Sequence, residues 1–220
     1  MDALVLARYI CHEHAHLQQW QPPTACQAAL RELLAHRATL VRQRSALAQA
    51  GCHNKALARL DEPVLAAMQQ AIAQIDEQLA RTVQADPASQ EAFEHITSVP
   101  GLGLVCGSLL VMLFGRMQTR SADAVIAFTG LDPRPNDSGK KTGQRRLSKR
   151  GWPEIRRLMY TAAMSAARTK TWNSFYRAQR DKGLSTTAAL VVLARKLLRV
   201  AFSLFKKRVK FDATLVAASA

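Results

Sequence analysis

The sequence predicts an all-α protein in which a long helical hairpin precedes a compact helical domain. Along residues 61–85, apolar side chains recur at alternating spacings of three and four, from Leu65 through Ile72 to Leu79. This period is typical of a helix that packs along another helix. Hydrophobic residues make up 48% of the 220 residues, so the chain can bury a sizeable core.

The positive charge of the chain is strong and uneven. Its 31 Lys and Arg outnumber its 16 Asp and Glu, which gives a net charge of +15. Residues 1–95 carry 8 basic and 10 acidic side chains, whereas residues 96–220 carry 23 and 6. Such an excess favours a polyanionic partner. We therefore expect a nucleic-acid surface in the second half.

Cysteine usage and hydropathy indicate the compartment. The four cysteines are scattered without a C-x-x-C pair, which fits reduced thiols in a cytoplasmic protein better than a disulfide framework. The longest apolar run, residues 101–114, spans 14 residues and includes three glycines. It is too short to cross a bilayer and is typical of a buried helix.

Residues 1–24 combine a short helix with a break. Asp2 lies at the expected N-terminus of this helix, where a negative charge interacts favourably with the helix dipole. Cysteines and histidines between Cys11 and Cys26 make a zinc site conceivable, because these are the usual zinc ligands. Their spacing lacks the close pairs of a zinc finger, which argues against that site. Two prolines then precede Thr24, a suitable N-cap for the next helix.

Residues 25–90 are expected to form an antiparallel helical hairpin of coiled-coil type. The pattern predicts helices over 25–50 and 61–85, with a turn at 51–54. A proline two residues after Asp61 indicates the start of the second helix.

Residues 91–115 predict two short helices joined by a glycine turn that resembles a helix-hairpin-helix. The turn at Gly101 and Gly103 would point backbone N–H groups at a DNA phosphate, to which the dipole of the second helix adds. Leu104 stands where a basic residue would strengthen this interpretation, so a purely structural hairpin stays open as well. A further short helix at 121–129 is expected to pack on this pair.

The serine loop, residues 128–157, is the most distinctive stretch of the chain. It carries Ser138 in a turn-rich half. Between Arg134 and Arg157 the only acidic residues are Asp137 and Glu154. Serine oxygen is a weak nucleophile that needs a base or a charged surround, and cations stabilise the charge that develops on a transferring phosphoryl group. From the residues alone, a solvated basic loop with an incidental serine is equally open. Nine basic residues lie in it: Arg134, Lys140, Lys141, Arg145, Arg146, Lys149, Arg150, Arg156 and Arg157.

Three helical segments follow. A proline at 153 opens a helix that runs to about Arg168, with Arg156 and Arg157 off its apolar face. The aromatic residues of 172–183 either stack on bases or belong to the core. Residues 185–210 form a basic amphipathic helix, suited to a DNA-binding domain or to a membrane surface.

Several motifs in the serine loop follow one another at fixed spacing. They are a Gly-Leu-x-Pro segment, a Ser-Gly pair and a Ser-Lys-x-Gly stretch that leads into Ile-Arg, formed by Gly130, Leu131, Pro133, Ser138, Gly139, Ser148, Lys149, Gly151, Ile155 and Arg156. This pattern resembles the C-terminal domain of the DEDD transposases, which are insertion-sequence recombinases that use a guide (bridge) RNA and are related to the Piv DNA invertase.

The resemblance implies an enzyme in which Ser138 attacks a DNA phosphodiester and forms a transient phosphoserine bond. In that family, an Asp, a Glu and two more Asp residues of an N-terminal RuvC-like domain chelate Mg²⁺. Asp2 matches the last of the four, and the other three are expected upstream of Met1. We therefore expect the chain to lack most of the RuvC-like domain, to bind no metal of its own and to be inactive alone.

The same resemblance implies domains and partners. Residues 1–24 correspond to the end of the RuvC-like domain, 25–90 to a coiled coil, 91–212 to the transposase domain, and 213–220 to a flexible tail. The implied partners are DNA, a guide RNA and further copies of the chain, as a dimer or tetramer through the coiled coil. A non-catalytic nucleic-acid-binding and dimerisation module is the alternative, and it differs in having no use for the Ser138 hydroxyl. A membrane-surface protein is favoured only by the last helix.

Overall fold

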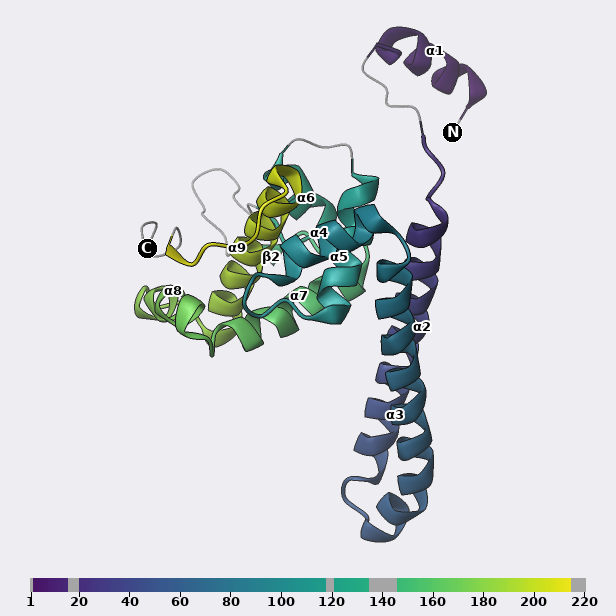
Figure 1. Cartoon of the computed structure of the whole chain (residues 1–220), viewed down its shortest axis with the longest axis vertical. Helices are drawn as coiled ribbons and strands as arrows, with labels where there is room; N and C mark the ends of the chain where they lie inside the picture. The colour runs from purple at the N-terminus through teal and green to yellow at the C-terminus, as the bar shows by residue number, and fades with distance from the viewer. Residues whose placement is uncertain (1, 16–19, 118–120, 135–145, 215–220) are drawn as a thin grey trace.

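The computed structural model describes residues 2–15, 20–117, 121–134 and 146–214. Within these ranges the chain forms nine helices and one antiparallel pair of two-residue strands, which confirms the all-α prediction. Figure 1 shows a long helical hairpin that projects from a compact helical domain. The first helix, α1 (Ala3–Glu13), lies apart from both, and none of its residues is buried.

The hairpin consists of α2 (Ala25–Gly51) and α3 (Lys55–Gln84). Thr24 caps α2, as the sequence predicts, and the structure adds a reciprocal capping box with Gln27. The predicted start of the second helix at Asp61 is wrong. The Asn54 side chain accepts hydrogen bonds from the first backbone N–H groups, so the helix begins at Lys55. Pro63 therefore lies inside α3, which gives up the hydrogen bond that a proline cannot donate.

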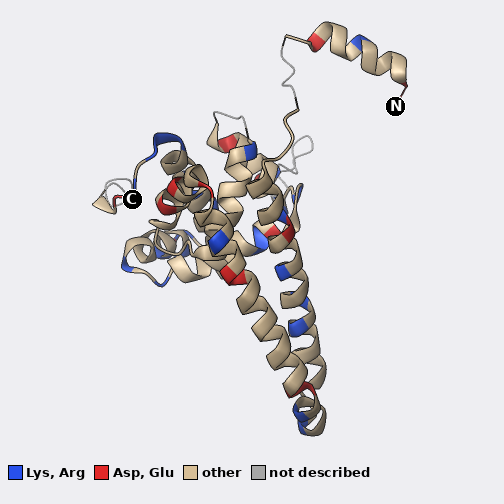
Figure 2. Cartoon of the chain, turned by 45° about the vertical axis from the view of Figure 1, so that its right-hand side comes forward, with Lys and Arg blue, Asp and Glu red and all other residues tan. Residues whose placement is uncertain are grey.

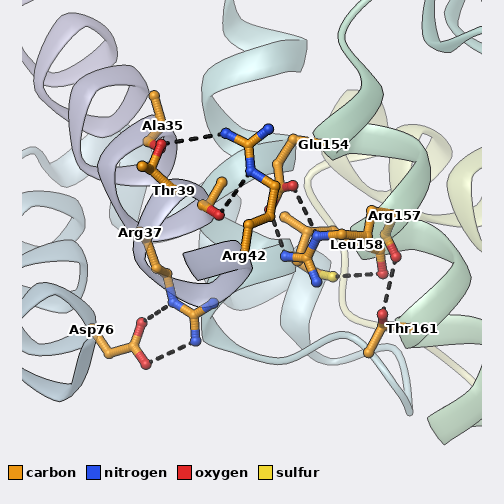
Figure 3. Close-up of polar contacts among 11 residues, drawn as sticks. Ala35, Arg37, Thr39, Arg42, Asp76, Glu154, Arg157, Leu158 and Thr161 are labelled. Atoms are coloured by element: carbon orange, nitrogen blue, oxygen red, sulfur yellow. Dashed lines mark hydrogen bonds and ion pairs between the residues drawn. The ribbon is translucent and has the colours of Figure 1, made fainter. Parts of the chain in front are cut away.

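The apolar stripe of α3 packs along α2, with Ile72, Ile75 and Leu79 buried. An ion pair crosses the hairpin where a charge interrupts the stripe of α2: Arg37 Nε lies 2.6 Å from Asp76 Oδ1 (Figure 3). Pairing lets a half-buried guanidinium sit among apolar neighbours.

The compact domain is built around α5 (Leu104–Arg116), in which every residue from Cys106 to Phe114 is buried. It packs against α2, α3, α7 (Pro153–Ala166) and α4 (Pro87–Thr97). Asp86 caps α4, so this helix begins at Pro87 rather than at 91. Proline is tolerated at that first position because its missing N–H would have no helical partner.

The remaining helices close the domain around α9 (Thr186–Lys207), which contacts α4, α7, α6 (Ala122–Thr129) and α8 (Lys170–Asp181). The sequence predicts that the short helix at 121–129 packs on the α4–α5 pair, but α6 packs mainly on α9 and α7, and Phe128 is 53% exposed.

Burial bears on two questions that the sequence leaves open. One is whether the aromatic residues of 172–183 stack on bases, and the other is what covers the apolar face of the last helix. Trp172 of α8 is fully buried and packs against Phe211, with 5.7 Å between ring centroids, so it belongs to the core rather than to a base-stacking surface. The apolar face of α9, nine residues from Ala189 to Leu204, is also buried. That face is therefore occupied by the core. Among the described helices, none combines the length and apolarity that a membrane span requires.

Candidate nucleic-acid interface

The predicted site residues divide into two groups. Ser138, Lys140, Lys141 and Arg145 lie outside the described residues. The others flank them on two short strands and the turns beside these. We call residues 129–134 and 146–151 the loop base, because they hold the two ends of the serine-bearing segment.

The loop base begins with strands β1 (Pro133–Arg134) and β2 (Arg146–Leu147), which the sequence does not predict. They pair antiparallel, with Arg134 opposite Arg146. The segment that carries Ser138 therefore leaves and re-enters the described structure at one place. Both arginines at this place are exposed.

Backbone hydrogen bonds continue the pairing beyond the strands. The N–H of Ser148 donates to the carbonyl of Asp132 at 2.9 Å, and the N–H of Lys149 donates to the carbonyl of Gly130 at 3.1 Å. The hydroxyl of Ser148 also donates to the Asp132 carboxylate. These contacts fasten the two arms of the loop base to each other.

Close backbone approach explains why glycines stand at 130 and 151. Gly130 has φ 69°, and a Cβ at this position would lie 2.2 Å from the carbonyl oxygen of Arg150. Gly151 has φ 80°, and its Cβ would lie 2.3 Å from the carbonyl oxygen of Phe128. Only glycine combines the left-handed backbone with this contact. Lys149 also has a positive φ, 53°, a conformation that costs energy for a residue with a side chain.

Arg156 locks this arrangement from α7. Its Nη1 group donates to the carbonyl oxygens of Thr129 at 3.1 Å, Arg150 at 2.8 Å and Gly151 at 3.3 Å. The sequence predicts Arg156 as a phosphate ligand, and that role stays a prediction. In the structure its guanidinium ties α6, the loop base and α7 together, a positioning role that no sequence pattern indicates.

Arg157, the next residue of α7, is held by an ion pair. Its Nη2 lies 2.5 Å from Oε1 of Glu154, which is only 8% exposed (Figure 3). The hydrogen bonding that Arg157 donates to the Glu154 carboxylate raises the pKa of Arg157, although partial burial acts in the opposite direction. The guanidinium is therefore both permanently charged and fixed in place.

Cys106 lies beneath this pair on α5. Its thiol donates to the Leu158 carbonyl oxygen at 3.4 Å, and burial raises its pKa to about 12. Such a thiol is an inert core group rather than a nucleophile.

Helix α9 adds two arginines near the loop base. Arg199 binds Asp123 of α6, with Nη2 2.6 Å from Oδ1, and this hydrogen bond lowers the pKa of the Asp123 carboxyl. Burial and then the charge of Arg199 lower the pKa of Arg195, while the carboxylates of Asp123 and Asp132 act in the opposite direction. Figure 2 shows further Lys and Arg on the compact domain and along the hairpin.

The glycine turn between α4 and α5 has one packed side and one open side. Gly101 lies against α7, where a Cβ would come within 2.6 Å of the Ala166 Cβ. Gly103, the N-cap of α5, has nothing within 4 Å of such a Cβ. Gly101 is thus required for packing, whereas the open backbone at Gly103 leaves room for the predicted phosphate.

Asp2 caps the first helix. Its side chain accepts a hydrogen bond from the N–H of Leu4 at 3.3 Å. Across the part of the chain that the structure describes, no three His, Cys, Asp or Glu side chains gather in a way that could hold a metal ion. The assignment of Asp2 to a metal-binding cluster stays a prediction.

Comparison with known proteins shows similarity to one family over part of the chain. Residues 93–177, which include the loop base and both ends of the serine-bearing segment, match the model of the transposase IS116/IS110/IS902 family. This central part of the chain is therefore similar to that transposase family.

Three named relatives are similar to this chain. The pilin gene-inverting protein of Moraxella lacunata is 24% identical over 219 residues, which cover 96% of this chain and 66% of the relative. The 44.8 kDa protein of insertion element IS116 from Streptomyces clavuligerus is 30% identical over 146 residues, which cover 66% of this chain and 36% of the relative. The transposase for insertion sequence element IS1328 from Yersinia enterocolitica is 29% identical over 131 residues, 57% of this chain and 39% of the relative. The chain thus spans about two thirds or less of each relative's length.

Proposed function

We propose that this chain is the DNA-binding and serine-bearing part of a transposase or site-specific recombinase that acts on DNA phosphodiesters. The observation that carries the proposal is the family match over 93–177, which includes the whole of the serine-bearing segment. A relative over most of the chain is named a gene-inverting protein, and inversion of a gene is a rearrangement of DNA.

The geometry of the loop base supports this function. Paired strands bring the ends of the serine-bearing segment together, and Arg156 fixes the turn that follows. Arg134, Arg146, Lys149 and Arg150 are exposed beside those ends. Exposed cations are suited to bind a nucleic-acid backbone, whose phosphates supply most of the non-specific affinity.

In the proposed reaction, Ser138 is the nucleophile. Its oxygen attacks the phosphorus of a DNA phosphodiester, a P–O(Ser) bond forms, and the bond to one deoxyribose oxygen breaks, so that a strand leaves with a free hydroxyl. The serine proton passes to a base, and the family resemblance assigns the supporting charge to Mg²⁺ held by a RuvC-like acidic cluster. A single carboxylate, Asp2, does not supply the several oxygen ligands that Mg²⁺ requires. We therefore propose that the chain alone does not cut DNA.

Assembly with other molecules belongs to the same proposal. Exposed apolar side chains at the outer half of the hairpin, Leu57, Leu60 and Val64, support association with a second copy through α3. A guide RNA as a further partner rests on the family resemblance alone.

A chimera tests the catalytic role. The chain is joined to the third of the Moraxella lacunata protein that it does not match, and is incubated with radiolabelled DNA and Mg²⁺. We expect a protein–DNA adduct that survives denaturation, is absent in Ser138→Ala, and persists in Ser174→Ala, a control at an exposed serine of α8. An adduct that persists in Ser138→Ala contradicts the serine assignment.

A second function is a non-catalytic DNA- or RNA-binding and dimerisation module. It is favoured by the exposed cations of the loop base, which bind phosphate whether or not Ser138 reacts. Salt-sensitive binding by both the unaltered chain and Ser138→Ala, with no adduct from any chimera, is the result that this function predicts.

A further inference from the structure

A hollow of about 260 Å³ lies beside the loop base, between β2, α7 and α9. Its inner surface is apolar and comes from three parts of the chain: Leu131 before β1, Leu147 of β2, and Val191 and Ala194 of α9. The ring of Tyr160, half-buried on α7, completes this surface. An apolar hollow with an aromatic wall is suited to hold a flat, weakly polar group.

The lining of the hollow also includes three cations, which a purely apolar ligand would not require. Lys149, Arg156 and Arg157 all contribute to it. Arg156 is held by three backbone carbonyls and Arg157 by Glu154, so these charges are in place before any ligand arrives. Lys149 is held in a left-handed conformation with φ 53°, which is the kind of backbone strain that clusters at functional sites.

The size of the hollow restricts what it can accept. Pockets for drug-sized ligands measure about 300–1,000 Å³, and this one is smaller. An inorganic anion would not use the apolar floor, and an apolar side chain of another protein would not use the three cations. A nucleotide uses both, because its base is flat and apolar on its faces while its phosphate is an anion.

We propose that this hollow binds one unpaired nucleotide, with its base against Tyr160, Val191 and Ala194 and its phosphate at Lys149, Arg156 and Arg157. The inference rests on the proposed nucleic-acid function and deepens it. The loop base would bind a strand in which one base is unstacked from its neighbours. Enzymes that act within a duplex often separate a nucleotide from its neighbours in this way.

The test uses two fluorescent DNA probes, a fully paired duplex and the same duplex with one unpaired 2-aminopurine. We expect the unaltered chain to bind the second probe about tenfold more tightly, the effect of stacking one base on a protein surface. Val191→Phe fills the hollow and should remove this preference without changing the affinity for the paired duplex. Val200→Phe, at a half-buried position of α9 outside the hollow, should retain the preference.

A second variant guards against a folding defect. Tyr160→Leu leaves the hollow open but removes the aromatic wall, and it should also weaken the preference for the unpaired base. The same probes with an RNA strand distinguish the source of the nucleotide, since a larger preference for one strand type identifies it. Equal binding of both probes by the unaltered chain, or an intact preference in Val191→Phe, overturns the inference alone. Failure to bind either probe contradicts the proposed function itself.

Discussion

Substitution of Gly130 by alanine should separate two physical costs at the loop base. The residue has φ 69°, and an added Cβ would lie 2.2 Å from the Arg150 carbonyl oxygen and 2.5 Å from its nitrogen. Both atoms belong to the backbone and cannot rotate away. Gly183 is a matched control, because it has a similar φ of 84° but nothing within 4 Å of an added Cβ.

The control carries only the cost of a side chain in the left-handed region, about 1–2 kcal/mol. Gly130→Ala adds the cost of forcing two backbone segments apart, about 1–3 kcal/mol by analogy with overpacked cores. For a protein of this length, 1 kcal/mol changes the melting temperature by about 2–4 °C. Gly130→Ala should therefore melt about 2–12 °C below Gly183→Ala.

Thermal denaturation followed by circular dichroism measures this difference, and DNA affinity at fixed salt measures its consequence. Displacement of Arg150 should weaken DNA binding in Gly130→Ala and leave it unchanged in Gly183→Ala, provided that both are assayed well below their melting temperatures. Equal melting temperatures for the two variants would refute the reasoning, because they would show that the contact between the two arms contributes nothing to stability.

Three further predictions concern charge. Burial raises the pKa of Cys106 from an ordinary 9.0 to about 12 in the folded chain. Between these values the folded state keeps a proton that the unfolded state loses, so stability falls as pH rises. Urea titrations above pH 9 should show that the free energy of unfolding falls less steeply with pH in Cys106→Ala than in the unaltered chain. The difference should be about 1.4 kcal/mol per pH unit. Glu154→Gln, at a pair whose arginine is 38% exposed, should lower the free energy of unfolding by about 1–2 kcal/mol in urea, and no change would contradict a role for the pair. Arg146→Gln should reduce the slope of log K against log salt for DNA by about 1, while Arg81→Gln on the hairpin should leave it unchanged.

Helices could be predicted from the sequence where periodicity and caps coincide. Thr24 indicates the start of α2, and the apolar stripe from Leu65 to Leu79 indicates its partner. The start of α3 was predicted wrongly because Asp61 with a nearby proline imitates a helix start. Asn54 caps the helix earlier, and the choice between two plausible caps depends on the turn that joins α2 to α3.

The loop base could be predicted only in part. Its glycines and cations are visible in the sequence, and the resemblance assigns the motif that contains them. The strand pair is only two residues on each side, too short to produce an alternating pattern. The positioning role of Arg156 depends on carbonyl oxygens of residues 129, 150 and 151, which meet only after α6 and α7 pack. Tyr160 and Val191 line one hollow for the same reason, since no local pattern connects them.

We propose that the loop base holds a segment whose Ser138 hydroxyl meets a nucleic-acid backbone. The most direct test of this proposal is peptide mass spectrometry of the chimera described above, after reaction with DNA and complete nuclease digestion. We expect a nucleotide mass on the peptide that contains Ser138, attached at that side chain. A nucleotide attached to another residue, or strand exchange with no attached nucleotide at any time point, would contradict the proposal.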